Sequence, residues 1–160
     1  MKKFLFLPVL FLMVVLLITC KKENKEIDFH PNLAATDNNV RAEFIFKDVF
    51  NYLFKVTNDT VVLNTGYAQI DGAQIYYITY PSPRFIVKFG DYFVICPDGL
   101  ARKGAYFADV TGGFNDPGTI ASVTFDDYYL HDMKIEAKET ITNQGRDNNN
   151  QLYFQYLVDS

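Results

Sequence analysis

Hydrophobic residues recur at three- and four-residue spacing in the segment that follows residue 36. This spacing places them on one face of a helix, and the residues that carry it are Phe46, Val49, Phe50, Leu53 and Phe54. Thr36 or Asp37 can cap the helix N-terminus. The pattern predicts one amphipathic helix over residues 38–56, whose Phe-rich face packs on a core.

After residue 58 the pattern changes to short runs of β-branched and aromatic residues, most of them bounded by Gly, Pro, Asn or Asp. Apolar and polar residues alternate in several runs, which is typical of an antiparallel sheet with one buried face. The connections are too short for crossover helices, and residues 116–118 and 130–133 have the composition of hairpin turns. The fold class is therefore α+β, with one N-terminal amphipathic helix packed on an antiparallel meander. The predicted strands are residues 61–63, 74–80, 85–89, 92–95, 104–111, 119–125, 133–142 and 152–158.

The first twenty residues have the pattern of an export signal. Lys2 and Lys3 precede an apolar run over residues 4–18, and Cys20 follows Thr19. A basic start and an apolar stretch of this length are typical of a signal peptide. A Cys at its end is typical of a lipoprotein, in which acyl chains such as palmitate are attached to that Cys. Because a spanning helix needs about 20 apolar residues, an uncleaved anchor is one alternative, and a cleaved soluble product is another.

This interpretation divides the chain into a lipoprotein signal peptide over residues 1–19, the acylated Cys20 with a flexible charged tether over residues 20–35, and a single domain over residues 36–160. The junction of Cys20 with Lys21 and Lys22 resembles lipoproteins of the Bacteroidota, although Thr19 replaces the usual Gly, Ala or Ser. We expect membrane lipid as a partner through Cys20. The expected location is the cell envelope, at the outer membrane, with the periplasmic or surface face left open.

Charge and cysteine content exclude some partners. The formal net charge is −4, and loss of Lys2 and Lys3 with the signal peptide makes the chain more acidic still. This charge disfavours nucleic acid as a partner. Acylation of Cys20 would leave Cys96 without an intrachain partner. Cys96 ends an apolar run, which predicts a buried and unreactive thiol.

Five short segments carry a family resemblance: residues 87–90 (VKFG), 96–104 (CPDGLARKG), 114–118 (FNDPG), 123–129 (VTFDDYY) and 140–145 (TITNQG). In this order and spacing they resemble a family of uncharacterised Bacteroidota lipoproteins with a lipid-anchored, β-rich domain. The resemblance covers residues 36–160. It implies the fold and the anchor, and it implies no activity.

The chain departs from that family in three places. The resemblance implies a second Cys upstream of Cys96, where this chain has QIYY at residues 74–77, so the expected disulfide is missing. The resemblance implies Asn-Gly at a turn where this chain has His131-Asp132. A tight turn is costlier with these residues, because neither enters positive φ as easily as Gly. Relatives also continue past Ser160, so this chain is expected to be a short or truncated member. If it is truncated, residues 152–158 form an apolar edge strand that invites association.

Residues with catalytic or metal-binding potential are sparse. The sequence has no Ser nucleophile elbow, zinc-protease motif, phosphate loop, zinc-spaced Cys pair or EF-hand pattern, so we assign no catalytic residue, metal site or cofactor and expect no enzymatic activity. Weak ligand candidates surround one predicted hairpin, namely Asp126, Asp127, Tyr128, His131 and Asp132. They could bind a divalent cation or pair a carboxylate with a Tyr in acid–base work. Turn and strand-end chemistry alone also explains them.

Two further features could bind ligands. Arg102 and Lys103 beside Asp98 could clamp an anion, although the loop charges of an acidic protein are usually solvated. Exposed tyrosines could stack on sugar rings or form a protein interface. The candidates for such a surface are Tyr76, Tyr80, Tyr92 and Tyr128.

The sequence therefore favours a membrane-anchored envelope lipoprotein of unknown function, interpreted as a non-catalytic binding or interaction module with an unidentified protein or glycan partner. An accessory glycan-binding lipoprotein is one alternative, which would need a coplanar row of exposed tyrosines. A hydrolase that uses Asp126 or Asp127 is the other alternative. It would need a second acid about 5 to 9.5 Å away across a cleft.

Overall fold

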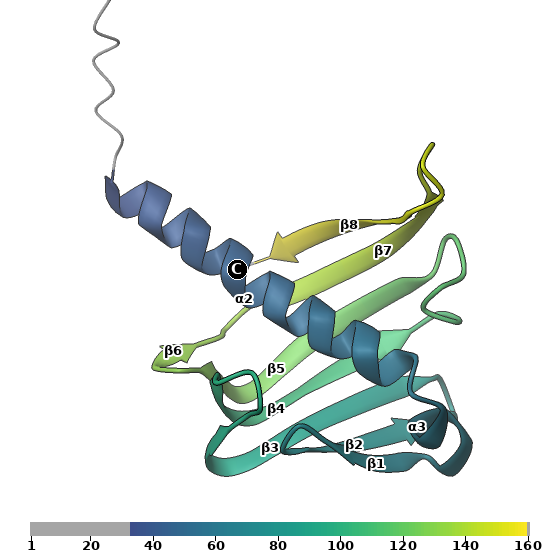
Figure 1. Cartoon of the computed structure of the whole chain (residues 1–160), viewed down its shortest axis with the longest axis horizontal. Coiled ribbons are helices and arrows are strands. Elements are labelled where there is room, and N and C mark those ends of the chain that lie inside the picture. The colour runs from purple at the N-terminus through teal and green to yellow at the C-terminus, as the bar shows by residue number, and fades with distance from the viewer. Residues whose placement is uncertain (1–32, 160) are drawn as a thin grey trace, which may run out of the picture. The chain divides into compact units, whose positions relative to one another are not determined.

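The computed structural model describes residues 33–159. The compact unit Asn38–Ser160 is an α+β domain in which helix α2 (Leu33–Thr57), from Asn38 onward, lies across one face of an eight-stranded antiparallel sheet (Figure 1). The predicted signal peptide, Cys20 and the tether up to residue 32 lie outside the described residues. Within residues 33–159, every helix is too short or too polar to cross a membrane.

Helix α2 follows the predicted amphipathic pattern but starts earlier. It begins at Leu33, so Thr36 and Asp37 lie inside the helix instead of capping it, and residues 33–35 are helical instead of part of the tether. Half-buried Phe side chains flank its buried stripe, as the spacing predicts. The fully buried members of that stripe are Val49, Leu53 and Val56.

A second helix, α3 (Thr60–Thr65), replaces the strand predicted over residues 61–63. Asp59 caps this helix, because its carboxylate accepts hydrogen bonds from the backbone N–H groups of Val61 and Val62 at 2.9 and 3.0 Å. Gly66 ends the helix in the left-handed region, at φ 75°. The strand prediction was wrong because capping at both ends outweighs the β propensity of a short Val-Val-Leu run.

The sheet is a meander, as predicted. The strand order is β1-β2-β3-β4-β5-β7-β8, and the short β6 pairs with β5 beside this path. All the pairings are antiparallel. The strands are β1 (Tyr67–Ile70), β2 (Ala73–Ile78), β3 (Arg84–Ile95), β4 (Ala101–Val110), β5 (Ile120–Leu130), β6 (Met133–Lys134), β7 (Lys138–Arg146) and β8 (Leu152–Asp159).

Several strands differ from the predicted set. Strand β1 was not predicted, and its four residues are too short a run to show a clear alternation. Residues 85–89 and 92–95 form the single strand β3, which is irregular at Gly90, where φ is 101°. The run predicted over residues 133–142 divides into β6 and β7, because β6 pairs with the end of β5 and β7 pairs with its beginning. The β5–β6 turn forms with His131 at φ 54°, without a glycine.

The core lies between α2 and the sheet face that α2 covers. Ile75, Val87 and Tyr106 are opposed across β2, β3 and β4, and all are fully buried. Burying the side chains of Ile75 and Val87 stabilises the fold by about 1.5–3 kcal/mol each. Cys96 borders this core as a free and buried thiol, which confirms the predicted burial, and desolvation raises the pKa of that thiol.

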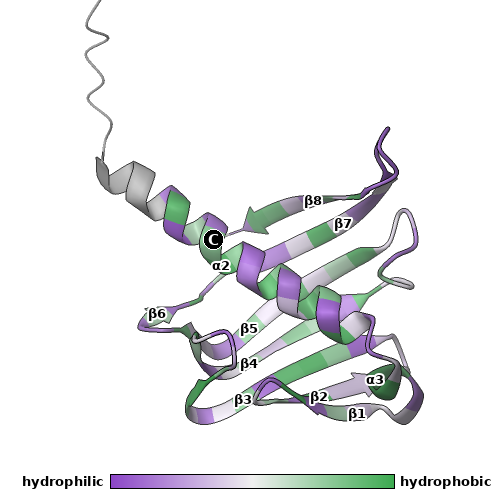
Figure 2. Ribbon diagram, viewed as in Figure 1, coloured by the Kyte–Doolittle hydropathy of each residue, from purple (hydrophilic) through white to green (hydrophobic). Residues whose placement is uncertain are grey.

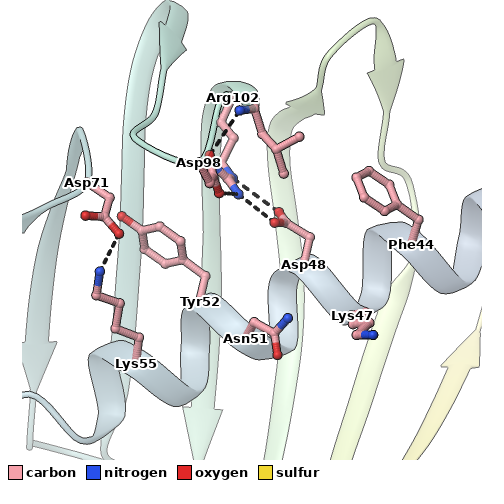
Figure 3. A pocket seen from close by; sticks show the side chains of 10 residues that line it. Phe44, Lys47, Asp48, Asn51, Tyr52, Lys55, Asp71, Asp98 and Arg102 are labelled. Carbon is pink, nitrogen blue, oxygen red and sulfur yellow. Dashed lines mark hydrogen bonds and ion pairs between the residues drawn. The ribbon is translucent and has the colours of Figure 1, made fainter.

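Arg102 of β4 joins helix α2 to the sheet (Figure 3). Only 1% of its side chain is exposed. Its guanidinium donates hydrogen bonds to both carboxylate oxygens of Asp48, on α2, at 2.5 and 3.2 Å. It also donates to both oxygens of Asp98, in the β3–β4 turn, at 2.6 and 3.0 Å. The ring centroids of Tyr52 and Phe89 lie 5.6 and 5.8 Å from its Cζ atom, within cation–π range.

The two carboxylates compensate the buried charge of Arg102. Burial disfavours the charged guanidinium, but the hydrogen bonds with Asp98 and Asp48 outweigh that effect and hold the pKa of Arg102 above its ordinary value. The hydrogen bond from Arg102 in turn lowers the pKa of Asp98. Because Asp48 belongs to α2, full compensation of the charge requires the helix to be docked on the sheet.

Replacement of Asp48 by Ala therefore tests how strongly this contact holds the helix. We expect Asp48→Ala to lower the free energy of unfolding by about 3 kcal/mol, the low end for breaking a buried ion pair, because Asp98 still balances part of the charge. The exposed pair of Arg84 and Asp109 has similar geometry, at 2.6 and 2.9 Å. Asp109→Ala should cost about 1 kcal/mol or less. Urea unfolding of both variants measures the difference, and equal costs would contradict the assignment.

Candidate functional site

Asp126 and Asp127 lie on β5 beside a kink in the sheet, and both are exposed. Asp127 has φ 45°, and the register between β4 and β5 shifts at this point. Gly104 of β4 is required opposite the kink, because a Cβ there would lie 2.1 Å from the backbone oxygen of Asp127. The Asp127 carboxylate pairs with Lys103 at 3.0 Å. The kink therefore turns two successive carboxylates outward, where regular alternation would place one of them inside.

The other predicted ligand candidates do not join these carboxylates at a common site. Tyr128 points into the core, with 1% of its surface exposed, and its ring packs against Tyr106 at 5.4 Å and Phe125 at 5.6 Å. His131 and Asp132 form the β5–β6 turn and are exposed. The five candidates thus lie in three separate places: Tyr128 in the core, Asp126 and Asp127 at the kink, and His131 and Asp132 in the turn.

A hollow of about 280 Å³ brings Asp126 and Asp127 near Asp91 of β3 and Lys88. All four side chains are exposed. Within residues 33–159, no group of His, Cys, Asp and Glu side chains has an arrangement that could hold a metal ion. The hollow is a surface depression lined by three carboxylates and one lysine.

A pocket of about 410 Å³ lies between α2 and the turns at one end of the sheet (Figure 3). Arg102 lines it, but its donors are occupied by Asp48 and Asp98. Lys55 of α2 is paired with Asp71 of the β1–β2 turn. The anion clamp predicted for Arg102 and Lys103 is therefore filled by the protein's own carboxylates. The alternative that Arg102 is a solvated loop charge was wrong, since Asp48 lies 54 residues away and gave no local signal.

The predicted tyrosine platform is scattered over the domain. Tyr128 is buried, which corrects its prediction as an exposed residue. Tyr80 in the β2–β3 turn and Tyr92 near the far end of β3 are each 85% exposed. Tyr76 lies beside Tyr67 on β2 and β1, with ring centroids 5.2 Å apart and planes tilted by 49°. Within the described part of the chain, these rings do not form a coplanar row.

Strand β8 forms one edge of the sheet as the structure describes it (Figure 1). It has eight residues, whereas β1 at the other edge has four. No charged residue or proline occurs between Leu152 and Val158, and Tyr153 and Leu157 are 59% and 60% exposed. Figure 2 shows a hydrophilic hairpin before β8 and hydrophobic residues at the end of the strand. Strand β8 confirms the strand predicted over residues 152–158.

A groove of about 440 Å³ runs between α2 and β8. Phe50 and Phe54 line it from the helix, and Leu152, Phe154 and Tyr156 line it from the strand. The Phe50 ring lies edge-on to Phe154 at 4.9 Å and to Tyr156 at 5.4 Å. The aromatic packing of the core thus continues outward to the open edge of the sheet. The Phe stripe was predicted as core, and only the placement of β8 shows that part of it lines a groove.

Glu139 of β7 is a buried acid that the sequence analysis missed. Its side chain lies on the covered face of the sheet, opposite Val123 of β5 and Val158 of β8, with no exposed surface. Neither carboxylate oxygen has a hydrogen-bond partner. Desolvation raises the pKa of Glu139 to about 8. Its position between Ala137 and Ile141 in the alternating pattern is the signal that could have revealed it.

Comparisons of the chain with protein families, with curated proteins and with solved structures found no match. The resemblance to Bacteroidota lipoproteins therefore stays a prediction. The β8 edge and its groove combine exposed apolar residues with an open strand.

Glu139 should make the stability of the domain fall as the pH rises. Below about pH 4.5 the carboxyl group is protonated in both states, and between pH 4.5 and 8 the unfolded chain releases the proton while the folded protein keeps it. This difference lowers the free energy of unfolding by on the order of 5 kcal/mol across that window. Glu139→Gln should remove this slope.

The matched control for Glu139→Gln is Glu136→Gln, because the Glu136 side chain is 73% exposed on the same segment. Urea unfolding at pH 5, 7 and 8.5 should give a flatter pH dependence for Glu139→Gln than for the wild type or Glu136→Gln. Parallel pH profiles for all three proteins would show that Glu139 does not keep its proton in the folded state.

Proposed function

We propose that the protein is a lipid-anchored envelope protein whose folded domain is a non-catalytic interaction module, and that the module binds its partner at the β8 edge. The observation that carries this proposal is the unprotected edge strand, eight residues long and without charge from Leu152 to Val158, beside an aromatic groove. No cofactor is required for such binding.

The physical argument starts from the behaviour of sheet edges. An edge strand presents N–H and C=O groups that can pair with another strand, and natural proteins usually shorten such edges or place charges and prolines on them. The β1 edge is shortened to four residues. The β8 edge has neither protection over residues 152–158, which supports a role in pairing.

The groove supports the same mode of binding. A strand added to β8 directs alternate side chains to the helix-covered face, where Phe50, Phe54 and Phe154 offer apolar contacts. Main-chain hydrogen bonds to β8 would supply affinity, and the groove would select apolar side chains at alternate positions. The module thus needs no catalytic group to recognise an extended segment.

The anchor is inferred from the sequence. The basic start, the apolar run over residues 4–18 and Cys20 support acylation, and the charged residues that follow support a tether that spaces the domain from the membrane. We place the protein in the cell envelope, at the outer membrane, as a member of the Bacteroidota lipoprotein family that it resembles. The net charge of −4 supports a partner other than nucleic acid.

Two alternatives have weaker support. Glycan binding would rest on Tyr67 and Tyr76, whose rings are tilted by 49°, whereas stacking on a sugar ring favours a flat platform. A carboxylate hydrolase would rest on Asp126 and Asp127 in the acidic hollow. Both carboxylates are exposed to water, and the Asp127 carboxylate is already paired with Lys103 at 3.0 Å.

The anchor is tested by intact mass and membrane fractionation of the expressed full chain beside Cys20→Ser. We expect the wild type to lose residues 1–19, gain acyl mass and sediment with membranes, and the variant to lose the acyl mass and leave the membrane fraction. If both proteins keep the uncleaved mass and stay in the membrane, residues 4–18 are a spanning anchor and the lipoprotein assignment is wrong.

The interaction surface is tested by site-specific photocrosslinking in the organism that makes the protein. A benzophenone amino acid replaces Tyr153 on β8 or, as the matched control, Tyr67 on β1, since these exposed tyrosines lie at opposite edges of the sheet. We expect a discrete crosslinked species from position 153 and none from position 67. Absence of crosslinks at position 153, or equal crosslinking at both, would remove the β8 edge as the binding surface.

A further inference from the structure

The composition of β8 allows it to pair with itself. In an antiparallel pair of identical strands related by a two-fold axis, one residue opposes its own copy and the residues before it oppose those after it. Because opposed residues share a sheet face, the axis must pass through a residue and not between two. With the axis at Gln155, the opposed pairs are Leu152 with Val158, Tyr153 with Leu157, and Phe154 with Tyr156.

The three pairs that flank the axis join apolar or aromatic side chains on a common face. Phe154 meets Tyr156 on the face that α2 covers, and Tyr153 meets Leu157 on the other face. Such aromatic and apolar cross-strand pairs stabilise antiparallel sheets. At the axis, the Gln155 Oε1 atom already accepts from Gln144 Nε2 at 3.1 Å, and each Gln155 amide nitrogen can donate to the Gln155 Oε1 of the other copy.

Charge favours the same register. The charged residue at the end of β8, Asp159, would oppose uncharged Gln151 of the other copy, so no like charges meet along the paired strands. Moving the axis to Tyr156 would instead place Asp159 opposite Tyr153. The register at Gln155 therefore pairs the uncharged residues of the edge without bringing a carboxylate among the aromatic rings.

The groove between α2 and β8 would be shared between the copies. A two-fold axis perpendicular to the sheet keeps each copy's α2 on the same face of the joined sheet. The Phe154 and Tyr156 rings of the second copy would then lie next to the first copy's groove, where Phe50 already packs edge-on against its own Phe154 and Tyr156. The aromatic cluster of one copy would continue into that of the other.

From these observations we propose that the partner at the β8 edge is a second copy of this chain. The two β8 strands pair antiparallel about Gln155 and join the two sheets into one. This inference rests on the proposed function only in taking the β8 edge as the binding surface. It names the partner, and it is independent of whether Cys20 is acylated.

A cysteine at the axis tests the register. Residues directly opposed in an antiparallel pair have Cα atoms about 4.5–5.5 Å apart, within the range that a disulfide bridges. Under mild oxidation, full-chain Gln155→Cys in membranes should form a disulfide between two copies and give a covalent species of twice the mass of one chain. On a non-reducing denaturing gel, which separates a dimer that is not covalently linked, the control Gln69→Cys on an exposed position of β1 should run at the mass of one chain. The wild type, which retains Cys20 and buried Cys96, should do the same.

A charge at the axis tests the dimer without a covalent bond. Gln155→Lys places two like charges opposite each other, so the detergent-solubilised protein should lose the dimer mass in light scattering, whereas Gln69→Lys should keep it. A monomeric wild type, or a dimer that survives Gln155→Lys, would overturn the proposal. If position 153 crosslinks to a species other than a second copy, the interaction module stands and the self-pairing is wrong.

Discussion

The contact of Arg102 with Asp48 and Asp98 is the constraint on which the arrangement of this domain depends. A guanidinium with 1% exposure is tolerable only because two carboxylates from separate elements surround it. One carboxylate comes from α2 and the other from the β3–β4 turn. The contact therefore couples the helix, the turn and the middle of the sheet, and it fixes which face of the sheet is covered.

Docking of α2 on that face also decides what remains available for binding. The helix buries Val49 and Leu53 fully, yet leaves Phe50 and Phe54 half-buried beside β8. In the pocket near Arg102, ion pairs join the guanidinium and one lysine to carboxylates that line the same pocket. The groove at β8, by contrast, ends at an open strand. An apolar groove and an open strand thus coincide at a single edge, which is why we propose that recognition occurs at this edge instead of at the acidic hollow.

The buried ionisable side chains Arg102 and Glu139 respond to desolvation in opposite ways: one stays charged and the other stays neutral. Arg102 keeps its charge because hydrogen bonds with Asp98 and Asp48 offset desolvation, while Glu139 has no partner and keeps its proton instead, with a pKa of about 8. The first group ties elements together, and the second makes stability depend on pH. Glu139 lies opposite Val158 of β8, so this sensitivity is located next to the edge strand.

Local pattern determined the helix, most strands, the meander and the burial of Cys96, because 3.6-residue and two-residue periodicities and turn residues act over short distances. The same rules failed where a local cap or kink intervened, as at Asp59 before α3 and at Asp127, and they did not place Tyr128 in the core. Tertiary structure alone paired Arg102 with Asp48, 54 residues away, isolated Glu139 and aligned β8 with the aromatic groove. Those outcomes depend on which segments distant in sequence come into contact, and the residues adjacent in sequence do not determine this.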